Sequence, residues 1–328
     1  MGARPTRIDR QEFVTPPEFS EFQLARAQAA RIGGVRLEMI ERAGTTRFGS
    51  AYHQVPILTM PAFSFDREPA ALVYLINLTA GLMNGDGHLV EIVARSGTNT
   101  VVTGQSATRI HPAVDSFCTQ QWSLEVEPGA CLVALPGPAI PYRGSRYYQR
   151  GRARLHDGAR LIWGDIWLAG RYQRGAASER FVFERIVQEL EVRRGDRLIY
   201  RDRFRWDGAW TDEEADWYFG GHLAAASLFA SEPIPPDIDL STPGVRSATL
   251  PLSSGAVCVR WCGPPALVIE SLVRASMQIA GAWHSGSTAR PWLLDSTELT
   301  PNHWFSKARS VSAEVEQSAS STVDIAIE

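Results

Sequence analysis

The residues most capable of chemistry in this chain are scattered rather than gathered in a familiar motif. Seven histidines occur with no HxH or HxxxH spacing, so no tight metal site is visible. His88 is the best exception, because it follows Asp86 by two residues in a glycine-rich turn. Asp165 stands between apolar neighbours in IWGDIW, where an unpaired buried carboxylate would be costly. Asp86, His88 and Asp165 are therefore the titratable side chains whose positions are the most unusual.

Recognised catalytic motifs are missing from the sequence. It contains no Gly-x-Ser-x-Gly elbow, no Walker A loop and no His-Glu-x-x-His pair. We therefore expect a protein that is not an enzyme and holds no tightly bound cofactor.

A recurring β-unit must position these residues. Strand-like segments turn at Gly97, Gly129, Gly158 and Gly195, at spacings of 32, 29 and 37 residues. Apolar and polar residues alternate, as in WSLEVE, which is typical of strands with one buried face. The pattern predicts a mainly β fold, either of stacked β-hairpins or of a β-solenoid-like body, with a few helices.

Other segments add to this prediction. AALVYLINLT is continuously apolar and predicts a strand buried on both faces. Residues 265–283 predict the longest helix, opened by prolines and near the C-terminus. The proline-rich LPGPAIPYRG predicts an edge strand or a rigid bent connection, because proline donates no backbone hydrogen bond.

Composition restricts the class of protein. The chain has 328 residues, 44% hydrophobic content and a formal charge of −3, which argues against nucleic-acid binding. No apolar run approaches the roughly 20 residues of a membrane span, and the N-terminus lacks an apolar signal region. We expect a cytoplasmic protein without membrane contact, whose four cysteines are buried or incidental thiols.

A family resemblance rests on ordered blocks of sequence. GLMNGDGHLVEI, VVTGQSATRIHP and LPGPAIPYRGSRYYQ resemble the signature blocks of the urease accessory protein UreD family, also called UreH. Further along, RGAASERFVFERI, LIYRDRFRWDG and VRWCGPPALVIESLVRA are also similar to that family. The departures, such as Ala80 in place of a second glycine, indicate a divergent member.

The resemblance implies a maturation role. It implies a scaffold and nickel-insertion chaperone that binds apo-urease and the accessory protein UreF, and through UreF the GTPase UreG. Transient Ni²⁺ transfer would then pass through or beside this chain, with Asp86, His88 and Asp165 as candidates, because carboxylates along a water-filled passage could hand on a cation without trapping it. The resemblance also implies that His222–Ala230 forms a strand, although its propensities favour a helix.

The family motifs also select residues. Glu179 matches a motif acid and joins the transfer candidates, while Asp86 matches the motif's Gly-Asp turn. Alternatively, Asp86 caps its turn and Glu179 pairs with Arg180 or Arg174. The motif positions expected to be structural are Gly81, Gly85, Thr103, Thr108, Arg109, Pro136, Pro138, Ile140, Pro141, Tyr142, Gln149, Gly175 and Phe181.

Partner contacts are expected in two places. One follows the proline-rich segment, where a packed corner is an equal alternative to an interface; the other is an exposed face of the C-terminal helix, for UreF. The interface candidates are Arg143, Tyr147, Tyr148, Leu272 and Met277.

The predicted organisation is an N-terminal segment (1–30), a single UreD-like β domain (31–305) and a C-terminal tail (306–328). Two other functions stay open. One is a β-solenoid enzyme acting on polysaccharide, with Asp86, Asp165 and Asp202 as possible acids. The other is a plain adaptor with no metal pathway.

Overall fold

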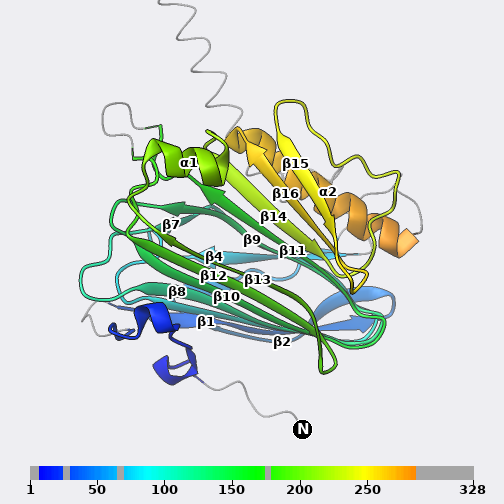
Figure 1. Cartoon of the computed structure of the whole chain (residues 1–328). Coiled ribbons are helices and arrows are strands. Elements are labelled where there is room, and N and C mark those ends of the chain that lie inside the picture. The colour runs from blue at the N-terminus through cyan, green and yellow to red at the C-terminus, as the bar shows by residue number, and fades with distance from the viewer. Residues whose placement is uncertain (1–6, 25–29, 65–69, 174–178, 286–328) are drawn as a thin grey trace, which may run out of the picture.

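Figure 1 shows a computed structural model of the chain, which describes residues 7–24, 30–64, 70–173 and 179–285. The fold is mainly β, as predicted, with its described strands in two sheets. Sheet A has the order β13-β12-β10-β8-β5-β1-β2, and sheet B has the order β15-β16-β14-β11-β9-β6-β4-β3, with β7 paired to β9.

The strands of sheet A are β1 (Ile32–Arg42), β2 (Thr45–Gln54), β5 (Gly87–Ala94), β8 (Cys118–Val126), β10 (Arg146–Leu155), β12 (Arg185–Arg194) and β13 (Arg197–Asp207). Those of sheet B are β3 (Ile57–Thr59), β4 (Ala71–Asn77), β6 (Asn99–Gly104), β7 (Thr108–Ile110), β9 (Cys131–Pro141), β11 (Arg160–Leu168), β14 (Ala224–Ala230), β15 (Arg246–Pro251) and β16 (Val257–Gly263). The helices are η1 (Arg10–Glu12), η2 (Pro17–Phe19), α1 (Asp212–Phe219) and α2 (Pro265–Ser285).

Three of the four predicted β-units are arches that join the two sheets. In β5–β6, β8–β9 and β10–β11 the first strand lies in sheet A and the second in sheet B. Corresponding strands of successive units pair in parallel: β5 with β8 and β8 with β10 in sheet A, and β6 with β9 and β9 with β11 in sheet B. Of the two predicted arrangements, the solenoid-like one describes these units, whereas β12–β13 is an antiparallel hairpin.

The turns of the arches stack on one another. Gly97, Gly129 and Gly158 have φ of 76°, 72° and 73°, a conformation that glycine adopts without steric cost. A Cβ added at Gly129 would lie 3.9 Å from the backbone N of Gly97, and one at Gly158 would lie 3.9 Å from the N of Gly129. The sequence period therefore becomes a stack of similar coils.

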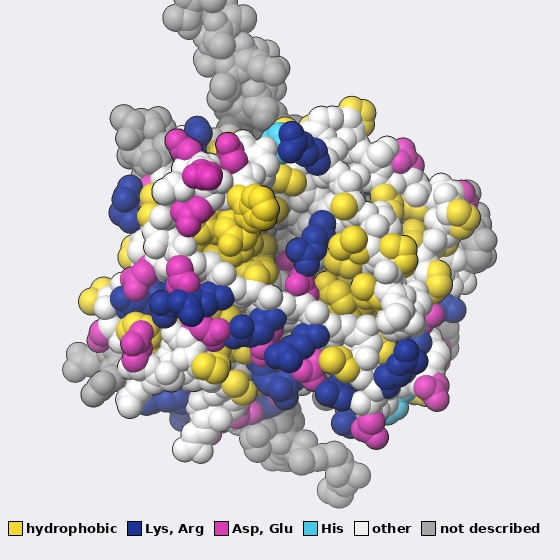
Figure 2. All heavy atoms as spheres, viewed as in Figure 1, with side chains coloured by type: hydrophobic (Ala, Val, Ile, Leu, Met, Phe, Trp, Pro, Cys, Tyr) yellow, Lys and Arg dark blue, Asp and Glu magenta, His cyan; other side chains and the backbone are white. Residues whose placement is uncertain are grey.

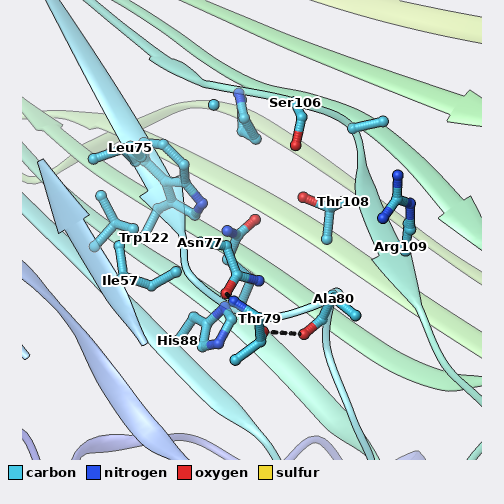
Figure 3. A pocket seen from close by; sticks show the side chains of 16 residues that line it. Ile57, Leu75, Asn77, Thr79, Ala80, His88, Ser106, Thr108, Arg109 and Trp122 are labelled. Atoms are coloured by element: carbon cyan, nitrogen blue, oxygen red, sulfur yellow. Dashed lines mark hydrogen bonds between the residues drawn. The ribbon is translucent and has the colours of Figure 1, made fainter. Parts of the chain in front are cut away.

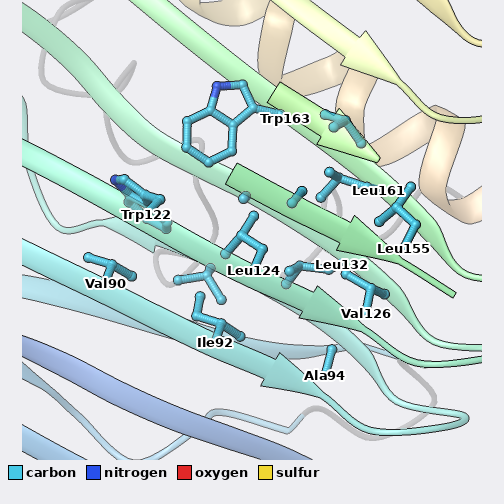
Figure 4. Close-up of a cluster of buried hydrophobic side chains, with 14 of the residues drawn as sticks. Val90, Ile92, Ala94, Trp122, Leu124, Val126, Leu132, Leu155, Leu161 and Trp163 are labelled. Carbon is cyan, nitrogen blue, oxygen red and sulfur yellow. The ribbon is translucent and has the colours of Figure 1, made fainter. Parts of the chain in front are cut away.

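Apolar side chains fill the space between the sheets. The alternating residues Trp122, Leu124 and Val126 of β8 are buried there, as the alternation predicts (Figure 4). Trp122 meets Trp163 of the opposite sheet edge to face, with ring centroids 5.4 Å apart. Each such side chain contributes about 1.5–3 kcal/mol through burial, so this layer holds the two sheets together.

The prediction that the proline-rich segment forms an edge strand or a connection was wrong. The segment lies in β9, which pairs with β11 on one side and with β6 and β7 on the other. On one side of β9, β6 pairs with Cys131–Leu135 and β7 with Ala139–Pro141. The intervening residues 136–138 have no strand partner there, and the pairing with β11 shifts register at the same point. Prolines are tolerated at such an irregularity because fewer ladder donors are required.

Helix α2 forms where predicted, but it does not present the expected contact residues. It lies along sheet B, against β14, β11 and β16 (Figure 1). Leu272 and Met277 are both 0% exposed and belong to the core on that side of the sheet. The prediction of direct partner contact through these two residues was wrong, because their burial attaches α2 to the sheet.

The N-terminal segment packs on the outer face of sheet A. Ile8, Phe13, Phe19 and Leu24 are buried against residues such as Tyr148. Residues 25–29, which follow this segment, and the tail predicted for 306–328 lie outside the described residues.

Candidate functional site

A row of polar side chains crosses the interior face of sheet A. His88, Gln120, Gln149 and Gln188 occupy neighbouring positions on β5, β8, β10 and β12, and the strand register aligns them directly. Each is at most 8% exposed, and each has the same inward orientation as the apolar core of its strand. We call these four residues the polar row.

Asp165 of β11 joins the polar row from the opposite sheet. Its carboxylate accepts hydrogen bonds from the side-chain amides of Gln149 and Gln188, the latter at 2.5 Å. Trp163 Nε1 donates to the same carboxylate at 2.5 Å. Burial raises the pKa of Asp165 to about 7, against the lowering effect of these donors. The cluster bridges the two sheets through a carboxylate that can change its charge near neutral pH.

A small cavity lies at the His88 end of the row (Figure 3). Its volume is about 50 Å³, and its polar lining includes Asn77, Thr79, Thr108 and Gln120. His88 Nε2, which lines the cavity, has no hydrogen-bond partner among the described residues. Burial lowers the pKa of His88 to about 3, so the imidazole is neutral and its free nitrogen suits a water or a metal ion.

An open bowl of about 530 Å³ adjoins this cavity and shares Ala80 and Arg109 with it. Tyr142 stands in the bowl between two other side chains, with the Arg171 guanidinium 4.3 Å from its ring centroid and the His111 ring at 5.0 Å. The cavity beside His88 therefore lies next to a surface depression that carries cationic side chains.

Glu179 lies beside the bowl and is held by arginine. It accepts from Arg171 at 2.5 and 2.9 Å and from the backbone N–H of Arg143 at 3.2 Å. These contacts, Arg171 first, lower the pKa of Glu179. Its partner is thus Arg171 instead of the expected Arg180, and Arg174 lies outside the described residues.

Asp86 caps its turn, as one of the two alternatives predicted. Its carboxylate accepts from the backbone N–H groups of Arg31 at 2.7 Å and Met83 at 2.9 Å. The side chain is 1% exposed, and burial raises its pKa although these bonds oppose the shift. Each oxygen of the Asp86 carboxylate thus accepts a backbone hydrogen bond. A transfer role for Asp86 stays a prediction.

Two interface candidates are buried. Tyr147 and Tyr148 are each 1% exposed, so the prediction that they contact a partner directly was wrong; they pack in the layers on either side of sheet A. Arg143, whose side chain is 65% exposed, remains available. Phe181 adopts φ of 55° and stacks on Trp210, and Gly175 lies outside the described residues.

Sequence reasoning missed Gln120 and Gln188 as members of the row. A signal was present, because His88, Gln120 and Gln149 each lie nine residues before the turn glycine of their unit. A polar residue at an inward position, repeated at a fixed distance from the turn, predicts a polar line through a solenoid.

Comparison with known proteins identifies the family of the chain. The family model described as UreD urease accessory protein matches residues 31–305. The chain belongs to the UreD family. Urease accessory protein UreD 2 of Streptomyces griseus is 30% identical over 79% of this chain and 89% of its own length. A UreD 2 of Synechococcus is 30% identical over 77% and 98%, and a UreD 3 of Methylorubrum populi is 29% identical over 62% and 65%.

Membership of the UreD family supports a role in urease maturation. The described part of this UreD chain gathers no group of three or more His, Cys, Asp or Glu side chains that could hold a metal ion. No helix among its described residues is long and apolar enough to cross a membrane. Each position of the polar row offers one or two donor atoms.

Proposed function

We propose that this chain is a non-enzymatic urease maturation factor that binds apo-urease and UreF, recruits UreG through UreF, and lets nickel pass. The family match supports the maturation role, and the polar row supports the metal route. A cytoplasmic location stays a prediction.

The chemistry of the row suits transfer rather than storage. Ni²⁺ accepts imidazole nitrogen and carboxylate or amide oxygen, which His88, Asp165 and the glutamines supply. These donors are spread along five strands, β5, β8, β10, β11 and β12, so a cation would meet few ligands at a time and would be held weakly. The ionised form of Asp165 would supply the one negative charge of the row.

The hydrogen-bonded cluster around Asp165 would block this route until its hydrogen bonds are broken. Gln149 and Gln188 donate directly to its carboxylate, so a passing cation must displace them. At the other end, Arg109 on the rim of the bowl would repel an unaccompanied cation. We therefore expect transfer only within a complex whose partner supplies acidic residues over this rim.

The test is urease activation in cells that carry the structural subunits and all accessory proteins. The chain is present, absent, or changed at Gln149→Leu, which removes an amide from the row. The exposed Gln105→Leu gives the same chemical change outside it. We expect deletion to abolish activation, and Gln149→Leu to lower urease nickel content and activity about tenfold or more while the complexes still co-purify.

Two results would contradict this proposal at different levels. Full activation without the chain would refute the urease role in that system. Normal nickel content with Gln149→Leu would remove the row from the route and favour the plain adaptor. The polysaccharide-enzyme alternative has little support, because Asp86 caps a turn, Asp165 is 4% exposed and Asp202 pairs with Arg260 at 2.7 Å.

A further inference from the structure

A groove opens where the two sheets end. Strand β13 is the last strand of sheet A, and β15 is the last strand of sheet B beside β16. Between them lies a hollow of about 390 Å³, lined by Asp202, Phe204 and Trp206 of β13 and by residues 246–248 and 260–262 of β15 and β16. The interior of the solenoid is therefore accessible at this end.

The groove presents aromatic rings. Phe204 and Trp206 stack with centroids 4.0 Å apart, and Trp167 meets both rings edge to face. Tyr218 of α1, 49% exposed, extends this surface, and its neighbour Trp217 is 83% exposed. Apolar surface that gathers in a hollow in this way is typical of a binding site.

Arginines border the groove on the side of β13. Figure 2 shows a band of basic side chains running below the apolar hollow. Arg201, Arg203 and Arg205 alternate with the inward residues of β13 and are exposed. Within the described residues, the side chain of Arg201 forms no ion pair or hydrogen bond, although Glu191 lies opposite it on β12 and interacts with it electrostatically. Arg246 lines the opposite wall of the groove.

The backbone of β13 is available as well. Among the described strands, β13 pairs only with β12, so its other edge has N–H and C=O groups without a strand partner. An added strand there would place alternate side chains in the groove and the others beside the arginines, because the side-chain period of a strand is two.

We propose that the groove binds an extended partner segment of alternating apolar and acidic residues, which adds as a strand to β13. Apolar side chains would contact Phe204 and Trp206 inside the groove, and carboxylates on the opposite face of the added strand would pair with Arg201. The inference builds on the proposed scaffold role, but it does not require nickel to pass through the chain.

The probe is a fluorescent seven-residue peptide, Glu-Val-Glu-Ile-Glu-Val-Glu, capped at both ends and titrated with the full chain in an anisotropy assay. We expect Arg201→Glu to weaken binding about fivefold or more, because it replaces an attraction with a repulsion. The matched control is Arg42→Glu, an exposed arginine on β1 at the other side of sheet A, which should not change binding.

Two altered peptides test the alternation and the strand pairing. A peptide of the same composition with its glutamates grouped should bind at least about fivefold more weakly, because it cannot separate the two kinds of side chain. N-methylation at alternate residues removes the backbone N–H donors along one edge of the peptide strand. Of two peptides methylated at the odd or at the even positions, one should lose binding. Equal binding of the grouped peptide, or an equal loss with Arg42→Glu, would overturn the proposal.

The chain's own sequence offers a competing occupant. Val323, Ile325 and Ile327 alternate with residues that include Asp324 and Glu328. If the peptide binds only after Val323→Asp, Ile325→Asp and Ile327→Asp are combined, the occupant is this chain itself and the partner proposal is overturned. Peptide binding together with full urease activation in cells that lack the chain would instead refute the urease role alone.

Discussion

At the scale of single residues, His88 and Asp165 oppose each other in how stability depends on pH. Burial raises the pKa of Asp165 from 3.8 to about 7, so the folded state binds a proton that the unfolded state has lost. Its contribution to stability therefore falls as pH rises from about 4 to about 7. Burial lowers the pKa of His88 from 6.5 to about 3, so its contribution rises with pH between about 3 and 6.5.

Each of these effects is of the order of 4 kcal/mol, and they cancel in part between pH 4 and 6.5. We expect single variants to reveal them. The stability of the wild type minus that of Asp165→Asn should decrease as pH rises from 4 to 7, and the difference from His88→Gln should increase between 4 and 6.5. Chemical denaturation at several pH values measures both differences. A difference from Asp165→Asn that stays flat would show that Asp165 is ionised throughout this range.

The residues of the site were only partly predictable. Asp86, His88 and Asp165 were recognised as unusual, because each places a titratable group in a turn or between apolar neighbours. The different environments of these three side chains depend on contacts between residues distant in sequence, such as the hydrogen bond from the Arg31 N–H to Asp86. Gln188 carries no charge and does not share the nine-residue spacing to the turn glycine, so only the register of parallel strands identifies it as a neighbour of Gln149.

At the scale of elements, the arches depend on their turn glycines. Gly129 has φ of 72°, and an added Cβ there would make only ordinary contact with Gly97. Backbone conformation rather than space should therefore decide the effect of a substitution. We expect Gly129→Ala to lower the free energy of unfolding by about 1–2 kcal/mol.

Gly129→Asn is the matched comparison, because asparagine tolerates the left-handed conformation better than alanine. Gly129→Asn should lower the free energy of unfolding less than Gly129→Ala does, when both variants are measured by urea titration. An equal cost for both substitutions would mean that packing between the stacked turns matters more than backbone strain.

The elements themselves were more predictable than their pairing. Alternation and turn glycines located β5, β6 and β8 to β13, and the apolar run located β4. Alternation does not state whether the two strands of a unit pair with each other or with the next unit, since both arrangements bury the same face. Helix α1 was missed although Thr211 and Glu214 form a capping box, because the aromatic residues around it obscured the signal.

At the scale of the whole molecule, the solenoid places its polar and aromatic features at different ends of the same interior. The cavity beside His88 lies under β5 and β8, and the groove beside Gln188 lies under β12 and β13. Gln149 and Asp165 occupy the coil between them. A route for a cation and a surface for a partner can therefore share one scaffold while remaining separately testable.

This arrangement predicts weak nickel binding by the chain alone. Sites with a full set of protein ligands bind zinc with about 10–16 kcal/mol, whereas the described residues bring no three His, Cys, Asp or Glu ligands together. We expect equilibrium dialysis of the purified full chain against Ni²⁺ to give a Kd weaker than about 1 μM, equivalent to about 8 kcal/mol. Asp165→Asn should weaken it further, because it removes the one carboxylate of the row. Stoichiometric binding tighter than this limit, unchanged by Asp165→Asn, would show that nickel is held at a site outside the polar row.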